Sequence, residues 1–386
     1  MRWRAGCRSS ACGQSTHPAK SLQLRASIAF VWHKQGYPSG ELRTKRPLRA
    51  VLPIQHSVFQ YACHHASELN MPSSSYRHLL TLKDMSRNRI EALLQRSEWM
   101  QTQTSDGKSL RERLKGRTVI NLFFEPSTRT RSSFQLAAQR LGADVLNFDA
   151  SISSTRKGET VLDTFLNLQA MGADLFVIRV AESGALEDIR THLKPQVRLI
   201  NAGDGRAAHP TQGLLDMLTI RQHKGEDFSA LKVLLVGDIK HSRVARSDLH
   251  ALQALGAGEI RVCGPASLMP DPHELQGCTY VACLDEALQD IDVVMMLRLQ
   301  RERMEEGLIA SLEDYHSAFG LTPNRLKRAR PDAIVTHPGP MNRGVEISDS
   351  VADGPQSVIL QQVSNGVAVR MAVMDTLVND RTWTTS

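Results

Sequence analysis

From about residue 76 onward, apolar residues follow two alternating patterns, short β-branched runs and longer stretches at helical spacing. The runs predict buried strands at 119–124, 175–178, 197–200, 233–236, 260–262, 293–297 and 333–335. Helical spacing is seen at Phe134, Ala137, Ala138 and Leu141, and Gly142 ends that pattern. Such alternation is typical of βαβ units, whose parallel sheets are covered by helices. We therefore predict an α/β fold with two doubly wound domains, each a mostly parallel sheet with helices on both faces.

The first 73 residues lack sustained periodicity, and we predict that 1–73 form a disordered N-terminal extension. An Arg-rich transit peptide, an interaction arm, or upstream sequence from a wrongly assigned start would each explain it. Met71 favours the last explanation, because a polar Pro-Ser-Ser-Ser stretch and then the first orderly helical pattern follow it. The remaining chain is long enough for two cores, and it contains no apolar membrane span.

The net positive charge of the chain comes from this N-terminal extension. Residues 1–70 hold ten basic and two acidic residues, whereas the rest holds 37 basic and 38 acidic residues out of 47 and 40 in total. No finger motif or aromatic-interleaved basic platform accompanies the charge, so we predict no nucleic-acid partner.

The six cysteines are Cys7, Cys12, Cys63, Cys263, Cys278 and Cys283, and none forms a Cys-x-x-Cys pair. This favours reduced thiols in a cytoplasmic protein over a disulfide framework or a zinc site. The sequence also lacks His-Glu-x-x-His, a glycine-rich dinucleotide turn and a Gly-x-x-x-x-Gly-Lys-Ser loop. We therefore expect neither a metal nor an organic cofactor.

Residues 123–134 read Phe-Phe-Glu-Pro-Ser-Thr-Arg-Thr-Arg-Ser-Ser-Phe, so that hydroxyls and guanidiniums gather between a predicted strand and a predicted helix. Ser127 and Thr128 fall at the helix N-terminus, where unpaired backbone N–H groups and the helix dipole attract anions. Arg129 and Arg131 add planar charged groups that match phosphate oxygens. A capped helix with solvated arginines is the plain alternative. The density of donors favours a phosphate site.

Other strand ends carry donors of the same kind. In open α/β sheets ligands bind beyond the carboxyl ends of the strands. The candidates at those ends are Ser127 to Arg131, Arg179, His209, Arg243, Arg298 and His337. Each alone could be a surface ion-pair partner or a turn residue, but together they predict a small, multiply anionic ligand between two domains.

Over roughly residues 75–378 these motifs resemble those of the transcarbamoylase family. Ser-Thr-Arg-Thr-Arg, from Ser127, resembles the carbamoyl-phosphate motif, and His209-Pro-Thr-Gln212 resembles the carbonyl-binding motif. Lys157 lies in a polar stretch similar to the family's mobile loop, which reaches a neighbouring subunit's site. Arg298-Leu-Gln300-Arg-Glu-Arg303 and His337-Pro-Gly-Pro-Met-Asn-Arg-Gly344 resemble motifs of the aspartate enzymes.

The same motifs separate the aspartate branch from the ornithine branch. Ornithine enzymes carry His-Cys-Leu-Pro where this chain has His-Pro-Gly-Pro, and they use a Ser-Met-Gly loop that is absent here. Arg243 and Arg298 suit a dicarboxylate acceptor, whereas they would repel a cationic one. A carbamoyltransferase for another amino acid and a non-catalytic homologue remain as alternatives. Two positions depart from the family pattern, because Gly339 stands where several members carry leucine and Val180 follows Arg179 where many carry histidine.

The resemblance implies transfer of the carbamoyl group of carbamoyl phosphate to the α-amine of L-aspartate, in de novo pyrimidine (UMP) biosynthesis. The implied catalytic residues are Arg129, Thr130, Lys157, Arg179 and His209. The implied carbamoyl-phosphate ligands are Ser127, Thr128, Arg129, Thr130, Ser153, Arg179, His209, Gln212, Gly339 and Pro340, with Ser151 and Ser154 competing with Ser153. The implied aspartate ligands are Lys157, Arg243, Arg298 and Gln300.

Two roles are open to His209, a neutral donor to the carbonyl or a general base toward the amine. We favour the donor, because the departing phosphate can accept the amine proton and nearby arginines disfavour a charged imidazole.

The resemblance also implies a domain plan and an assembly. Residues 74–219 would bind carbamoyl phosphate, 220–360 would bind aspartate, and 361–386 would form a C-terminal helix that returns to the first domain. The hinge is expected near 210–222 and 363–377. The implied assembly is a homotrimer with shared active sites, and regulatory or dihydroorotase-like chains in a higher assembly are left open.

Overall fold

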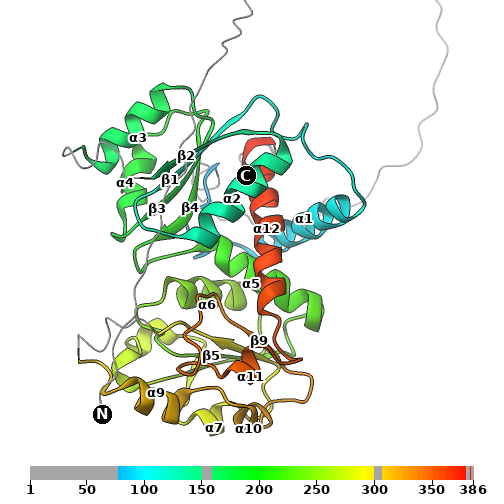
Figure 1. Cartoon of the computed structure of the whole chain (residues 1–386), viewed down its shortest axis with the longest axis vertical. Helices are drawn as coiled ribbons and strands as arrows, with labels where there is room; N and C mark the ends of the chain where they lie inside the picture. The colour runs from blue at the N-terminus through cyan, green and yellow to red at the C-terminus, as the bar shows by residue number, and fades with distance from the viewer. Residues whose placement is uncertain (1–76, 150–158, 300–306, 380–382, 384–386) are drawn as a thin grey trace, which may run out of the picture. The chain divides into compact units, whose positions relative to one another are not determined.

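The computed structural model of the chain describes residues 77–149, 159–299, 307–379 and 383. Two separate parallel sheets organise these residues, each with helices packed against it (Figure 1). This confirms the predicted fold class. The predicted extension, 1–73, lies outside the described residues.

The first sheet has four parallel strands in the order β2-β1-β3-β4. Its strands are β1 (Thr118–Phe123), β2 (Asp144–Asp149), β3 (Leu175–Val180) and β4 (Arg198–Asp204). Helices α2 (Thr128–Leu141), α3 (Val161–Ala170) and α4 (Ala185–Thr191) connect them. The central strands β1 and β3 are buried almost throughout, as expected for a sheet covered on both faces.

The second sheet has five parallel strands in the order β7-β6-β5-β8-β9. Its strands are β5 (Lys232–Val236), β6 (Glu259–Cys263), β7 (Thr279–Tyr280), β8 (Val293–Met296) and β9 (Ile334–Thr336). Its helices are α6 (Arg243–Leu255), α7 (Leu284–Ala287), α9 (Leu312–Phe319), α10 (Pro323–Leu326) and α11 (Asp349–Ala352), with short 3-10 turns at Ala266–Leu268 and Pro272–Leu275.

All seven predicted strands are present, and two further strands, β2 and β7, were not predicted. Both lie at the edge of their sheets. The sequence of β2, Asp-Val-Leu-Asn-Phe-Asp, mixes polar and apolar residues, and both residues of β7 are exposed. Edge strands of this kind lack the continuous apolar run that revealed the central ones.

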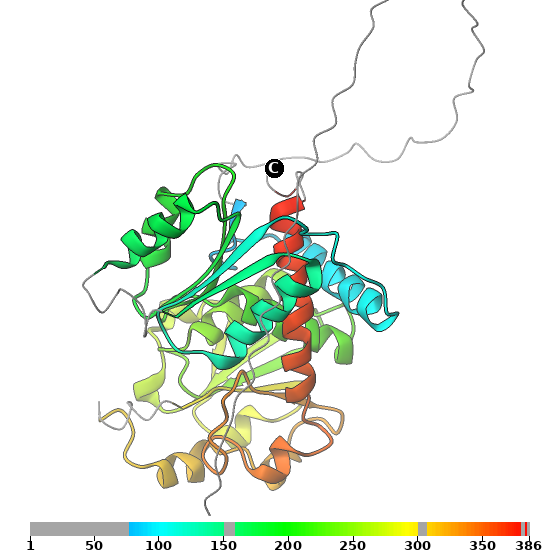
Figure 2. The same cartoon turned by 45° about the horizontal axis from the view of Figure 1, so that its top comes forward.

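Three long helices connect or flank the two sheets. They are α1 (Arg87–Ser105), α5 (Pro210–Lys224) and α12 (Ile359–Asn379), and α12 packs against α1, α2 and α5 (Figures 1 and 2). Helix α5 leads from β4 to β5 and therefore runs across the predicted boundary at 219/220. Both predicted hinge segments, 210–222 and 363–377, lie within α5 and α12. None of the described helices is apolar enough over a sufficient length to cross a membrane.

Helices α5 and α6 approach each other closely at Gly213. A Cβ atom at this position would lie 3.1 Å from the backbone oxygen of Ser247 and 2.8 Å from Leu82. The hydroxyl of Ser247 in turn accepts a hydrogen bond from the backbone N–H of His209 at 2.9 Å. Close helix packing therefore fixes the start of α5, where His209 lies.

Candidate active site

A cavity of about 800 Å³ lies at the carboxyl ends of strands from both sheets. Its size suits small ligands. Of the predicted site residues that the structure describes, it brings together there Ser127, Thr128, Arg129, Thr130, Arg179, His209, Gln212, Arg243, Arg298, His337, Gly339 and Pro340. Arg131, which was predicted to bind the phosphate beside Arg129, does not line the cavity. Three further predicted residues, Ser153, Lys157 and Gln300, lie outside the described residues.

The loop between β1 and α2 forms one wall of the cavity. Ser127 is the N-cap residue of α2 and has extended backbone angles, yet its side chain does not cap the helix. Thr128 begins the helix, and Thr130 is buried two residues later in the first turn. The first backbone N–H groups of α2 and these hydroxyls therefore provide a set of donors for an anion.

Arg129 crosses from α2 to the loop that follows β9. Its Nη2 donates to the carbonyl oxygen of Pro338 at 3.3 Å. Gly339 has φ +63°, and a Cβ atom there would lie only 2.8 Å from Cζ of Arg129. The absence of a side chain at Gly339 thus leaves space for the guanidinium. Burial, followed by the charge of Arg298, lowers the pKa of Arg129.

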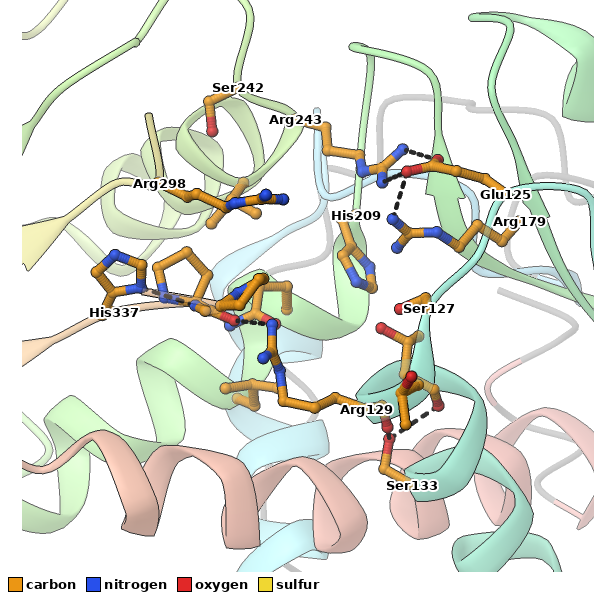
Figure 3. Close-up of a pocket in the computed structure, with 18 of the residues that line it drawn as sticks. Glu125, Ser127, Arg129, Ser133, Arg179, His209, Ser242, Arg243, Arg298 and His337 are labelled. Carbon is orange, nitrogen blue, oxygen red and sulfur yellow. Dashed lines mark hydrogen bonds and ion pairs between the residues drawn. The ribbon is translucent and has the colours of Figure 1, made fainter. Parts of the chain in front are cut away.

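Glu125 joins two of the predicted arginines and was not among the predicted site residues. Its carboxylate accepts hydrogen bonds from Nη2 of Arg179 at 2.7 Å and from Nη1 and Nη2 of Arg243, each at 3.0 Å (Figure 3). Burial opposes ionisation of Glu125, but the contacts with Arg243 and Arg179 outweigh it and lower its pKa. Because Glu125 follows β1 and Arg243 begins α6, this cluster links the two sheets.

The cavity carries an excess of positive charge. Arg129, Arg179, Arg206, Arg243, Arg298 and Arg370 line it, against the acidic residues Glu125 and Asp238. Burial, and then repulsion by Arg243, lowers the pKa of Arg179 to about 10. A bound anion would relieve this repulsion, so the excess positive charge of the cavity favours a small, multiply anionic ligand.

His209 lies at the N-terminus of α5 with its ring between the Glu125 cluster and Arg129 (Figure 3). It is 4% exposed, and its Nδ1 has no hydrogen-bond partner among the described residues. Burial, and then the charges of Arg243, Arg179 and Arg370, hold its pKa well below the ordinary value. The imidazole is therefore neutral at physiological pH, and one ring nitrogen can donate into the cavity.

His337 has a buried support that sequence reasoning missed. Its Nδ1 accepts a hydrogen bond from the N–H of Gly339 at 2.8 Å, and its Nε2 lies 3.1 Å from Oε1 of Glu346. The ring proton therefore resides on Nε2 and points to the Glu346 carboxylate. The backbone N–H of Asn342 also donates to Glu346, at 2.6 Å. The pair fixes the His-Pro-Gly-Pro loop against the second sheet.

Two family models match most of the chain. The one described as the carbamoyl-P binding domain of aspartate/ornithine carbamoyltransferase matches residues 77–222, and the one described as the Asp/Orn binding domain matches residues 229–377. The chain is 64% identical over 301 residues to the aspartate carbamoyltransferase catalytic subunit of Xanthomonas euvesicatoria pv. vesicatoria, covering 78% of this chain and 96% of that one. It is 62% identical over 307 residues to the corresponding subunit of Stenotrophomonas maltophilia, covering 79% and 97%.

Solved structures agree with these similarities. Aspartate transcarbamoylase from Trypanosoma cruzi in complex with N-(phosphonacetyl)-L-aspartic acid matches with a TM-score of 0.71 and 33% identity, over 79% of this chain and 97% of that one. Ornithine carbamoyltransferase from Pyrococcus furiosus matches with a TM-score of 0.70 and 29% identity, over 80% and 98%.

Proposed function

Because the chain belongs to the aspartate and ornithine carbamoyltransferase family, we propose that carbamoyl phosphate and L-aspartate react in the cavity between its two sheets. The chain is a carbamoyltransferase of the aspartate type, and its products are N-carbamoyl-L-aspartate and phosphate. We assign this reaction to de novo pyrimidine biosynthesis. The observation that carries the proposal is the convergence of the α2 N-terminus, Arg179, His209 and Arg298 on one cavity.

The phosphate group is held by the start of α2. The hydroxyls of Ser127, Thr128 and Thr130 and the first N–H groups of the helix donate to its oxygens, while Arg129 supplies a planar charge. Ser153 and Lys157 are proposed to complete this pocket. As the C–O bond breaks, charge accumulates on the departing phosphate, so these donors stabilise the transition state more than the substrate.

The carbamoyl group lies next to Gln212 and the His-Pro-Gly-Pro loop. Nε2 of Gln212 already donates to both carboxylate oxygens of Asp216, at 3.1 and 3.2 Å. The amide oxygen of Gln212 is therefore left to accept from the carbamoyl NH₂ group, beside Gly339 and Pro340.

The neutral α-amine of aspartate attacks the carbamoyl carbon, and the carbonyl oxygen becomes negative. Arg179, Thr130 and neutral His209 donate to this oxygen. The reaction needs no covalent nucleophile from the protein. The C–O bond to phosphate then breaks, and the phosphate accepts the amine proton. Arg243, Arg298 and Gln300 hold the aspartate carboxylates, so the two domains must close to bring amine and carbonyl together.

The acceptor is tested by incubating the purified chain with carbamoyl phosphate and either L-aspartate or L-ornithine. We expect carbamoyl aspartate to form and citrulline not to form, because the cationic side chain of ornithine would face Arg243 and Arg298. Citrulline formation would instead favour the ornithine branch. Absence of both products from folded protein would support a non-catalytic homologue.

Glu125→Gln is expected to raise the KM for L-aspartate by about tenfold or more, the effect of one lost charge-assisted hydrogen bond. The substitution leaves Arg179 and Arg243 facing each other without the anion that separates them. Steady-state kinetics measure the effect. Glu187→Gln is the matched control, because Glu187 pairs with Arg190 on the exposed surface of α4. An unchanged KM in Glu125→Gln would show that Glu125 does not hold Arg243 in place for the aspartate carboxylates.

We propose that the active unit is a homotrimer in which Lys157 serves the site of a neighbouring subunit. Mixing unfolded Lys157→Ala chains with unfolded His209→Ala chains and refolding them together should then restore part of the activity, because some sites receive both native residues. Each variant refolded alone should stay nearly inactive. If the mixture is no more active than the separate variants, Lys157 serves its own subunit.

We also propose that the chain acts in the cytoplasm, without nucleic acid as a partner. The support is that Cys263, Cys278 and Cys283 are free thiols, and that the basic excess lies in residues 1–70. Regulatory or dihydroorotase-like chains would be detected by sizing the native enzyme.

A further inference from the structure

Two buried carboxyl groups, Asp216 and Asp248, lie outside the lining of the cavity and contact no substrate in the proposed mechanism. Asp216 lies on α5 and Asp248 on α6, which pack against each other, and both residues have 0% exposure. The two carboxyl groups are close enough for each to shift the pKa of the other. Helix α5 carries His209 at its start, and α6 begins with Arg243. The carboxyl pair therefore joins the two helices that present these residues to the cavity.

Asp216 orients two amides that line the cavity. It accepts hydrogen bonds from Nε2 of Gln212 and, through a very short contact, from Nε2 of Gln362. The other end of the Gln362 amide accepts from the backbone N–H of His337 at 3.0 Å. Both amides are thus fixed in one orientation, with the Gln212 oxygen left for a ligand.

Asp248 has a different environment. Neither of its oxygens accepts a hydrogen bond from any N–H donor among the described residues. Two ionised carboxylates cannot stay in contact in a buried site, so one of them must keep a proton. Asp216 has the amide donors and the charge of Arg370 to stabilise an anion, whereas Asp248 has neither. The proton therefore belongs on Asp248.

The surrounding elements add little other charge. From α12, Arg370 faces Asp216, and at the start of α5 His209 is held neutral. Helix α1 packs on both α5 and α6, and its buried residues, Ile90, Leu93, Leu94, Ser97 and Met100, do not titrate. Burial raises the pKa of both carboxyl groups, and the charge of Asp216 raises that of Asp248 further.

We propose that Asp216 and Asp248 share one proton and together form a positioning pair, which holds Gln212 and Gln362 in the orientation that carbamoyl phosphate requires. The hydroxyl of Asp248 donates to Asp216, and Asp216 accepts from both amides. Loss of the proton puts a second negative charge between α5 and α6 and disturbs both amides. The positioning role rests on the proposed function, whereas the shared proton does not.

Asp248→Asn tests the shared proton, because asparagine keeps the shape and donates an N–H that does not titrate. Between about pH 4 and the folded pKa, the unfolded chain has lost a proton that the folded pair retains. The free energy of unfolding of the wild type therefore falls as pH rises through this range. The free energy of unfolding of Asp248→Asn should fall less steeply over the same range. Thermal unfolding across pH measures the difference. The infrared spectrum of the wild type should also contain a protonated-carboxyl C=O band that Asp248→Asn lacks.

Asp248→Leu tests the positioning role, because leucine has a similar volume and no donor. We expect kcat/KM for carbamoyl phosphate to fall by about 10- to 100-fold, the effect of losing a charge-assisted hydrogen bond. At neutral pH the kcat/KM of Asp248→Asn should stay within about fivefold of the wild-type value. At alkaline pH it should exceed the wild-type value by a margin that grows with pH.

If the free energy of unfolding depends on pH in the same way in the wild type and in Asp248→Asn, and no infrared band is lost, the proposal of a shared proton is wrong. Folded Asp248→Leu with the kinetics of Asp248→Asn would overturn the positioning role. Failure of the proposed function is recognised separately, because the wild type would then form no carbamoyl aspartate while the unfolding and infrared results still decide about the proton.

Discussion

Replacement of Arg129 by alanine is expected to remove nearly all turnover, by roughly 1000-fold, while the protein stays folded. Arg129 lies in the first turn of α2, where its guanidinium lines the cavity and donates a hydrogen bond to Pro338. The neighbouring hydroxyls of Ser127 and Thr128 are uncharged and cannot replace the guanidinium. The substitution therefore weakens phosphate binding and also removes stabilisation of the charge that develops on the leaving group.

Steady-state kinetics with varied carbamoyl phosphate, together with circular dichroism, measure this result. Arg140→Ala is the matched control, because it removes the same charge from the last turn of the same helix, away from the cavity. Arg129→Lys should be intermediate, since lysine keeps the charge but not the planar fork. A folded Arg129→Ala protein with kcat/KM within about tenfold of wild type would contradict the assignment of Arg129 to the phosphate.

The convergence of the site could be predicted because topology dictates it. Parallel strands of one sheet end at the same edge, so Arg179 near the end of β3 and the loop after β1 had to lie close together. The same reasoning applies to Arg298 after β8 and His337 after β9 in the second sheet. Local apolar runs were sufficient to locate these strands, and therefore to locate the residues at their ends.

The supporting residues could not be predicted in the same way. Glu125 is separated from Arg179 and Arg243 by 54 and 118 positions, and no local pattern encodes such a pairing. The signal for Glu125 was only that an acid precedes a cationic phosphate motif. Glu346 accepts from Asn342 and His337 in a buried site, although its residue type predicts exposure.

Helix α5 illustrates a second reason why supporting residues could not be predicted from the sequence. Every residue from Pro210 to Arg221 is buried, so this part of the helix has no solvent face and no amphipathic pattern. Asp216 in its centre would ordinarily indicate the exposed side of a helix. Its burial depends on the contacts with Gln212, Gln362 and Asp248, which come from three helices and exist only in the folded chain.

His209→Ala is expected to lower kcat by about 100- to 1000-fold, the effect of removing one donor from an oxyanion site. The effect on binding of the phosphate group should be smaller, since the α2 donors remain. Because the pKa of His209 lies well below its ordinary value, the imidazole stays neutral as pH falls through about 6.5. The wild-type rate should therefore show no loss from His209 protonation near that pH.

His209→Gln separates the donor role from the base role. The side-chain amide of glutamine donates a hydrogen bond but cannot remove a proton at neutral pH. If His209 stabilises the carbonyl oxygen, His209→Gln should be clearly faster than His209→Ala, and its pH–rate profile should match that of the wild type. If both variants are equally slow, His209 acts as the base, and the phosphate is not the group that accepts the amine proton. The second result would assign to this buried imidazole a charged state that Arg179, Arg243 and Arg370 oppose.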